Sequence, residues 1–291
     1  MRVYAILAGV CYLLAGTPAL GSNRLNLPQI SAEVNLTLGQ VQAIFEMQPD
    51  KGGLLLAARE TQILINSLPA DFRAGCHDMV QDFGLQAAAQ TTWAWSVTLL
   101  HTENGRSGQS ALLAFRCTAH VPDVTYSDER LALLLNGQKT VLKLLALDND
   151  CTNCSDLYHL KFVQRFNAEN GYFAELRLEH TTENPCCDGG DTDSGARLLL
   201  IAIPSGSVAL SFDKETHFYN HDDQDGDTET ECKSVVTYER ESSSLLGVNT
   251  QTACTENGKP KPPVSVMRYR WDRAKERFEG SATTSSKSSP K

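Results

Sequence analysis

The most regular feature of the chain is an alternation of apolar and polar residues, which begins near residue 93 and has the two-residue period of a half-buried β-strand. The first two such stretches place apolar side chains at Trp93, Trp95, Val97 and Leu99, and at Ala111, Leu113, Phe115 and Cys117. The segment 103–108 between them is rich in turn-forming residues. The pattern therefore predicts a β-hairpin.

A second hairpin is predicted around Asn136-Gly137, because a tight two-residue turn needs positive φ at both central residues and this pair adopts it readily. The flanking stretches 131–135 and 141–147 carry apolar residues on both faces. Strands with this pattern are covered on both sides, so we expect these two to lie centrally in a sheet.

Residues 158–179 predict a third hairpin, in which Phe166 opposes Tyr172 and His159 opposes Glu179. One face of this hairpin is then apolar, with Tyr158, Leu160, Phe162, Phe166, Tyr172, Leu176 and Leu178. The other face is polar, with His159, Lys161, Arg165, Glu175, Arg177 and Glu179. We expect the first face to pack on the core and the second to face water. The His159–Glu179 pair is interpreted as a solvated cross-strand pair and not as catalytic.

Further strands are predicted at 198–203 and 208–212, which form a fourth hairpin, and at 235–238 and 266–271. About ten short strands without intervening helices predict a mainly β fold, either an antiparallel β-sandwich or an open barrel.

The residues before these strands predict a small, partly helical segment. Thr37 is expected to cap a helix that ends near Pro49. A second helix is expected to begin at 68–71 and to stop at Gly84, because apolar residues recur between them at helical spacing.

The N-terminus predicts a secretory signal peptide, because Arg2 precedes an almost unbroken apolar stretch over 3–15 and 19–21 is an acceptable cleavage site. The stretch is shorter than the roughly 20 residues that span a bilayer. We therefore expect an exported protein, secreted or periplasmic, that does not span a membrane. The predicted organisation is a signal peptide at 1–21, a mixed segment at 22–90, an antiparallel β domain at 91–280 and a disordered tail at 281–291.

Removal of the signal peptide leaves eight of the nine cysteines, and an even number in an exported chain indicates disulfides. Cys151 and Cys154 have three interpretations. A redox pair would open a helix, whereas strands are predicted on both sides here. A zinc site would add Cys186 and Cys187, but adjacent cysteines chelate one metal awkwardly. We adopt the third interpretation, two disulfides that link 151 and 154 to 186 and 187, since the third hairpin brings residues 157 and 181 together.

The other four cysteines are paired by layout. Cys232 and Cys254 are expected to bridge, because the chain between them can double back around 241–244. Cys76 and Cys117 are then left to join the helical segment to the β domain.

The net charge of −9 is concentrated in two segments, 183–193 and 222–231, which contain ten of the 35 acidic residues and no Lys or Arg. The rest of the chain is nearly neutral, with 25 acidic and 26 basic residues. No basic stripe with interleaved aromatic residues occurs, so the sequence does not predict a nucleic-acid partner.

Calcium is the cation that these acidic segments would attract, since it prefers carboxylate oxygens. The candidate ligands are Asp222, Asp223, Asp225, Asp227 and Glu229, with a second group of Asp188, Asp191 and Asp193. The match to a helix–loop–helix calcium motif is partial: with Gly226 at the sixth position, His221 and Cys232 stand where acids are needed. The alternative is a pair of solvated loops without a metal.

Signatures of catalysis are missing from the sequence: it has no Gly-x-Ser-x-Gly, His-Glu-x-x-His or Walker motif. The tryptophans at 93 and 95 are expected in the core, so Trp271, beside Arg268 and Arg270, is the better exposed candidate for stacking on a sugar. We therefore favour a non-catalytic exported protein that binds a protein or glycan partner or an envelope component, with calcium as a stabilising ion. The alternatives are a secreted hydrolase with a carboxylate pair assembled in space and a structural calcium, and a structural envelope protein without a ligand.

Overall fold

The computed structural model describes residues 31–33, 36–50, 52–68, 70, 73, 92–105, 108–121, 124–145, 157–184, 191–220, 227–242 and 244–282. These residues form two α-helices and fourteen β-strands, in two sheets that we name A and B. The helices are α1 (Leu38–Glu46) and α2 (Ala58–Ser67). The strands of sheet A are β1 (Ser31–Glu33), β2 (Leu54–Leu55), β3 (Thr92–Gly105), β4 (Gly108–Val121), β5 (Val124–Asn136) and β6 (Thr140–Leu145). Those of sheet B are β7 (Leu157–Ala168), β8 (Gly171–Asn184), β9 (Asp191–Ile203), β10 (Ser207–Asn220), β11 (Thr228–Glu241), β12 (Ser244–Glu256), β13 (Lys259–Asp272) and β14 (Arg277–Ala282).

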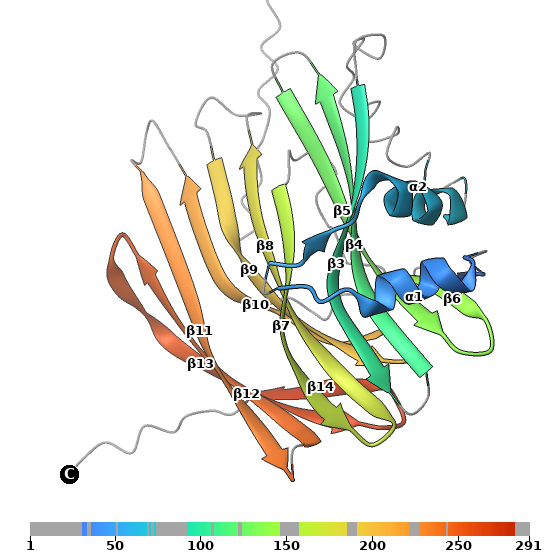
Figure 1. Ribbon diagram of the computed structural model, residues 1–291. Helices are drawn as coiled ribbons and strands as arrows, with labels where there is room; N and C mark the ends of the chain where they lie inside the picture. The colour runs from blue at the N-terminus through green and yellow to red at the C-terminus, as the bar shows by residue number, and fades with distance from the viewer. Residues whose placement is uncertain are drawn as a thin grey trace, which may run out of the picture.

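The predicted mainly β, antiparallel fold is confirmed, since every strand pairing but one is antiparallel. The exception is the parallel contact between Asn167 of β7 and Ser244 of β12. Because β12 also pairs with β11, strands β7 to β12 close a ring of six, from which β13 and β14 continue. Sheet A stacks on sheet B as a separate sheet (Figure 1).

Sheet A is buried on both faces, as the sequence around Asn136 predicts. Leu131 and Leu133 of β5 point toward sheet B, whereas Ala132 and Leu134 point toward the helices, and all four are fully buried. The helices α1 and α2 cover the outer face of sheet A (Figure 1). The helical segment therefore shares one hydrophobic cluster with sheet A.

A third hydrophobic cluster joins the strands of sheet B to one another. It brings together Phe166 of β7, Phe173 of β8, Val248 of β12 and Phe278 of β14, with side chains from the other strands of the sheet. Aromatic rings dominate it: the ring centroids of Phe173 and Phe278 are 5.4 Å apart. This cluster explains why β12 to β14 fold back toward β7 to β10, because both halves of sheet B bury apolar faces against each other.

The first predicted helix is confirmed, including its cap. The Thr37 hydroxyl accepts a hydrogen bond from the Gln40 backbone N–H at 3.4 Å, and the Gln40 side chain accepts one from the Thr37 N–H at 2.8 Å. Helix α2, which buries Leu64 and Ile65, was not predicted. Nearly all of the second predicted helix, over 68–84, lies outside the described residues, as do the predicted signal peptide and most of the tail.

The third hairpin forms, but its predicted register is wrong beyond Phe162. His159 opposes Glu179 as expected, whereas Phe166 opposes Phe173, because Val163 is an extra residue that forms a β-bulge. The bulge reverses the alternation, so Phe166 points into the third cluster while Phe162 points toward sheet A.

The predicted polar face of this hairpin is also corrected in part. Glu175 does not face water: it lies on the same face of β8 as Phe173 and is 3% exposed. Its carboxylate accepts a hydrogen bond from Gln164 Nε2 at 2.7 Å and another from the Tyr238 hydroxyl, which satisfies the buried charge. Burial, with the Glu175 charge next in size, raises the pKa of Tyr238.

The other hairpins are confirmed with small differences. The turn between β5 and β6 contains three residues, 137–139, and not the predicted two. The strands β1, β2, β12 and β14 were not predicted as such, which accounts for the low estimate of about ten strands. No described helix is long and apolar enough to cross a bilayer.

Candidate functional site

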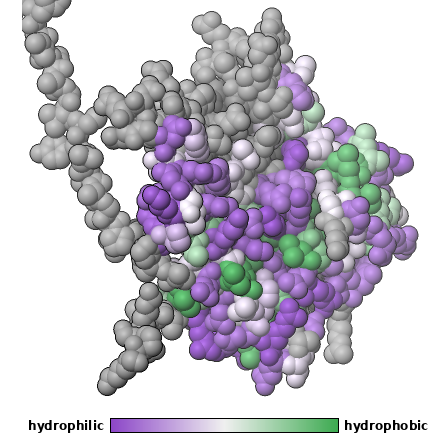
Figure 2. Space-filling model, turned by 90° about the vertical axis from the view of Figure 1, so that its left-hand side faces the viewer, coloured by the Kyte–Doolittle hydropathy of each residue, from purple (hydrophilic) through white to green (hydrophobic). Residues whose placement is uncertain are grey.

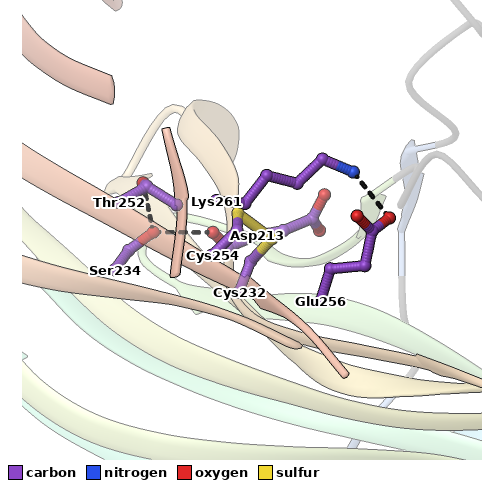
Figure 3. Close-up of a disulfide and its surroundings, with 7 residues drawn as sticks. All are labelled: Asp213, Cys232, Ser234, Thr252, Cys254, Glu256 and Lys261. Atoms are coloured by element: carbon purple, nitrogen blue, oxygen red, sulfur yellow. Dashed lines mark hydrogen bonds and ion pairs between the residues drawn. A yellow bond between two sulfur atoms is a disulfide. The ribbon is translucent and has the colours of Figure 1, made fainter. Parts of the chain in front are cut away.

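The predicted Cys232–Cys254 disulfide is confirmed. The two cysteines lie directly opposite each other on β11 and β12, with 4.0 Å between their Cα atoms. Two pairs further along the two strands, the Ser234 and Thr252 hydroxyls are 2.6 Å apart, and Ser234 also donates to the Asp213 carbonyl of β10 (Figure 3). The disulfide thus reinforces the place where β10 and β11 begin to separate.

The remaining disulfide predictions are tested only in part. Cys117 is buried and disulfide-bonded, and its partner lies outside the described residues, as does Cys76, the predicted partner. The cysteines at 151, 154, 186 and 187 also lie outside them. The placement that motivated their pairing is confirmed, because Leu157 opposes Thr181 in the β7–β8 ladder.

The described parts of the two acidic segments lie side by side at one end of sheet B. Thr192 of β9 opposes Tyr219 of β10, which in turn opposes Glu229 of β11. Asp191 and Asp193 therefore lie within a strand and not in the predicted loop, and Glu229 is likewise in a strand.

The acidic residues that the structure describes in detail are engaged by neighbours. Glu229 lies 2.7 Å from His217 Nε2, Glu231 lies 2.6 Å from Lys233 Nζ, and Asp227 accepts a hydrogen bond from Tyr219. Within the described ranges, no group of three or more His, Cys, Asp or Glu residues is arranged to hold a metal ion. Asp188, Asp222, Asp223 and Asp225 lie outside those ranges, so calcium binding stays a prediction.

A groove of about 1020 Å³ lies at the end of the molecule where the turns of both sheets meet. The β3–β4 and β5–β6 hairpins of sheet A form one wall, and the β7–β8 and β9–β10 hairpins of sheet B form the other. We call this feature the inter-sheet groove. No motif in the sequence indicates it, because its residues come from four separate hairpins.

The wall from sheet A carries a chain of side-chain hydrogen bonds. Asn136 donates to Gln109 at 2.8 Å and Gln109 donates to Asn104 at 2.9 Å, while Thr140 donates to Asn136 at 3.3 Å. These contacts link the four strands β3 to β6 and hold the amides in place. Each amide still has donor or acceptor capacity that the described residues do not use.

Arg165 joins the two walls. Its guanidinium forms an ion pair with Glu103 of β3, donates to Asn167 at 2.7 Å and lies over the Tyr172 ring at 5.3 Å from the centroid. Arg165 was predicted to face water and its side chain is 40% exposed, but the Val163 bulge places it on the face of β7 that meets sheet A.

Tyr172 and Ser110 form a second link between the sheets, with 3.0 Å between their hydroxyl oxygens. Burial raises the pKa of Tyr172 to about 12, although the Ser110 hydrogen bond acts in the opposite direction. The phenol therefore stays protonated at neutral pH and remains a hydrogen-bonding group of the groove.

His101 lies behind this link, stacked on Phe162 with 4.0 Å between ring centroids. Burial lowers the pKa of His101, and the Arg165 charge adds to that effect, whereas Glu103, 3.5 Å from His101 Nε2, opposes it. His101 is therefore a predominantly neutral ring that supports the Glu103–Arg165 pair.

A second cavity of about 450 Å³ adjoins the inter-sheet groove and shares Lys143, Tyr172 and Pro204 with it. Trp271 lines this cavity, where its ring packs edge-on against Phe173 at 4.8 Å between centroids. The tryptophan that the sequence singled out for sugar stacking therefore borders a cavity, although part of it belongs to the third hydrophobic cluster.

No protein-family model matches the chain, and neither a curated protein nor a solved structure gives a match. The face of the molecule shown in Figure 2 is mainly hydrophilic, with hydrophobic residues in separate small patches. The inter-sheet groove, with its ordered polar lining, is the candidate functional site.

Proposed function

We propose that this protein is an exported, non-catalytic binding protein whose ligand is an oligosaccharide held in the inter-sheet groove. The observation that carries the proposal is the lining of the groove. Amide side chains from both sheets, the Ser110 and Tyr172 hydroxyls and apolar residues such as Leu135 and Ile203 surround one cavity.

Amide and hydroxyl side chains suit a sugar because they both donate and accept hydrogen bonds, as sugar hydroxyls do. The Trp271 ring in the adjoining cavity offers an aromatic surface for the apolar face of a sugar ring. A volume of about 1020 Å³ stands at the upper end of the roughly 300–1,000 Å³ typical of small-molecule sites. The groove therefore has room for more than one sugar unit.

Preorganisation of the lining also supports binding. The Asn136–Gln109–Asn104 chain and the Arg165–Glu103 pair hold polar groups in place before a ligand arrives. Side chains that are already ordered lose less entropy on binding, so more of the interaction energy contributes to affinity.

Hydrolysis of the ligand has less support than binding. A glycosidase needs two carboxyl groups that flank the scissile bond, one of them protonated. The carboxylates that line the inter-sheet groove are Glu103 and Glu169, and each forms an ion pair with an arginine, Arg165 and Arg273 respectively.

The disulfides at Cys117 and Cys232 support the exported location, since such bonds persist in oxidising compartments.

The proposal is tested by binding of the mature protein to an array of neutral and acidic glycans, with a variant that fills the groove. Gly137 lines the groove, and a Cβ added there meets no atom within 4 Å. Gly137→Trp should therefore fold normally and reduce glycan binding at least tenfold.

Gly39→Trp is the matched control, because a Cβ at Gly39 of α1 also meets no atom within 4 Å and α1 lies on the other face of sheet A. It should bind glycans as the unsubstituted protein does. An array without any bound glycan, or equal binding by Gly137→Trp, would contradict the proposal and favour a structural envelope role.

A further inference from the structure

We infer that the ligand of the inter-sheet groove is an acidic oligosaccharide and that the Lys143 ammonium binds its carboxylate. This inference rests on the proposed function and specifies the chemical class of the ligand. It is carried by the position of Lys143, its charge environment and its place between the two cavities.

The position of Lys143 departs from the apolar pattern of its strand. On the face of β5 and β6 that meets sheet B, Leu131 pairs with Leu145 and both are buried. The next pair on this face is Leu133 with Lys143, and the pair after it is Leu135 with Val141. A lysine thus stands where the core pattern calls for an apolar residue, at the point where the sheets part and the groove begins.

The charge of Lys143 is uncompensated among the described residues, unlike that of the other cations that line the groove or the adjoining cavity. Lys139 lies 2.9 Å from Glu33, Arg273 lies 2.8 Å from Glu169, and Arg165 pairs with Glu103. No described carboxylate forms a salt bridge with Lys143. A carboxylate supplied by a ligand would compensate this charge through a charge-assisted hydrogen bond.

The ammonium is also held in position. Lys143 Nζ donates to the Ser205 carbonyl at 3.1 Å and lies 3.5 Å from the Pro204 carbonyl, both in the β9–β10 turn. This turn is itself closed by a hydrogen bond from the Gly206 N–H to the Ala202 carbonyl at 2.7 Å. Two carbonyls leave one of the three ammonium donors for a ligand.

Lys143 lines both the inter-sheet groove and the adjoining cavity, so a carboxylate bound there lies between the polar wall and Trp271. This arrangement suits a sugar acid, in which a charged group and a ring face belong to one unit. Glu276 borders only the second cavity, on the exposed turn before β14, and would disfavour a second acidic unit there.

The test compares each acidic glycan with its own methyl ester, which keeps the sugar and removes the charge. Oligogalacturonates, hyaluronan fragments and sialylated oligosaccharides, each as acid and as methyl ester, would be titrated calorimetrically into the mature protein. We expect at least one acid to bind tenfold or more tightly than its ester. Lys143→Met, which keeps the apolar stem, should remove that preference and leave the affinity for the ester within twofold.

Lys261→Met is the control, because Lys261 pairs with Glu256 beside the Cys232–Cys254 disulfide and does not line the groove (Figure 3). It should keep the full preference for acids. If esters or neutral glycans bind as tightly as acids, or Lys143→Met keeps the preference, the inference is wrong while the proposed function stands. If no glycan of either kind binds, the proposed function itself fails. If Lys143→Met does not fold, the comparison of acid with ester in the unsubstituted protein still tests whether the groove prefers an acidic ligand.

Discussion

At the scale of single residues, the contacts between the sheets include several polar groups. Glu129 of β5 is 5% exposed and accepts a hydrogen bond from the Leu160 N–H of β7 at 3.0 Å, and Ser110 contacts Tyr172 further along the interface. His101 lies in the same layer, close to Glu103 and Arg165. Polar groups buried between sheets fix one relative position of the sheets, because any shift would leave them without partners.

The buried imidazole makes stability depend on pH. Because the pKa of His101 is lower in the folded state than its ordinary value near 6.5, the unfolded chain takes up a proton first as the pH falls. The contribution of the neutral His101 ring to the free energy of unfolding is fully present above about pH 6.5. It is lost as the pH falls toward the folded-state pKa of His101. The melting temperature should therefore drop between pH 7.5 and pH 5.

His101→Gln isolates this effect, since glutamine cannot take up the proton. The variant should melt lower at pH 7.5, because it loses the stacking on Phe162, but its further drop at pH 5 should be smaller than that of the unsubstituted protein. His159, whose pKa is lowered mainly by burial, accounts for a remaining part of the drop. Equal drops in both proteins would show that His101 does not carry the dependence.

At the scale of elements, α1 shows how local chemistry and packing combine. The helix has nine residues, too few for stability in isolation. Its capping box satisfies two backbone N–H donors at the N-terminus, and Val41, Ile44 and Phe45 bury one face against sheet A.

Thr37→Ala should lower the free energy of unfolding by about 1 kcal/mol, because the hydroxyl that accepts from Gln40 is removed. Thr37→Ser keeps the hydroxyl and should lose less than about 0.5 kcal/mol. Urea denaturation followed by circular dichroism measures both. Indistinguishable midpoints for the alanine and serine variants would mean that the cap does not contribute.

At the scale of the whole molecule, sheet A lies between the helices and sheet B (Figure 1). The described parts of the two acidic segments gather at one end of sheet B. The gathering has an electrostatic cost, since carboxylates of like charge are brought together. His217 and Lys233 offset part of it. A bound cation would offset more, which keeps the calcium prediction open to a direct test.

Calcium binding predicts a rise in melting temperature on adding millimolar calcium to protein first treated with a chelator. A concentration 100 times the dissociation constant would stabilise the fold by about 2.7 kcal/mol. Replacing Asp223 and Asp225 with Asn should abolish the rise, and magnesium at the same concentration serves as the control ion. A melting temperature unchanged by calcium would leave the acidic segments as solvated surface.

Much of the fold follows from local patterns in the sequence. Two-residue alternation and turn residues predicted the hairpins over 93–117, 131–147 and 198–212, and Thr37 predicted the start of α1. Each of these features depends on neighbours within a few residues, so the sequence suffices. The Cys232–Cys254 disulfide follows from the same kind of local pattern, because one hairpin joins its cysteines.

Long-range contacts decided the rest. The Val163 bulge reversed the faces of β7 and so placed Arg165 against Tyr172, which no regular alternation could predict. The inter-sheet groove exists because four hairpin ends meet where sheets A and B part. Lys143 becomes a candidate binding residue only because it lines this groove. Side-chain pattern thus determined strands and turns, whereas the packing of one sheet on another, which depends on residues distant in the chain, determined the candidate site.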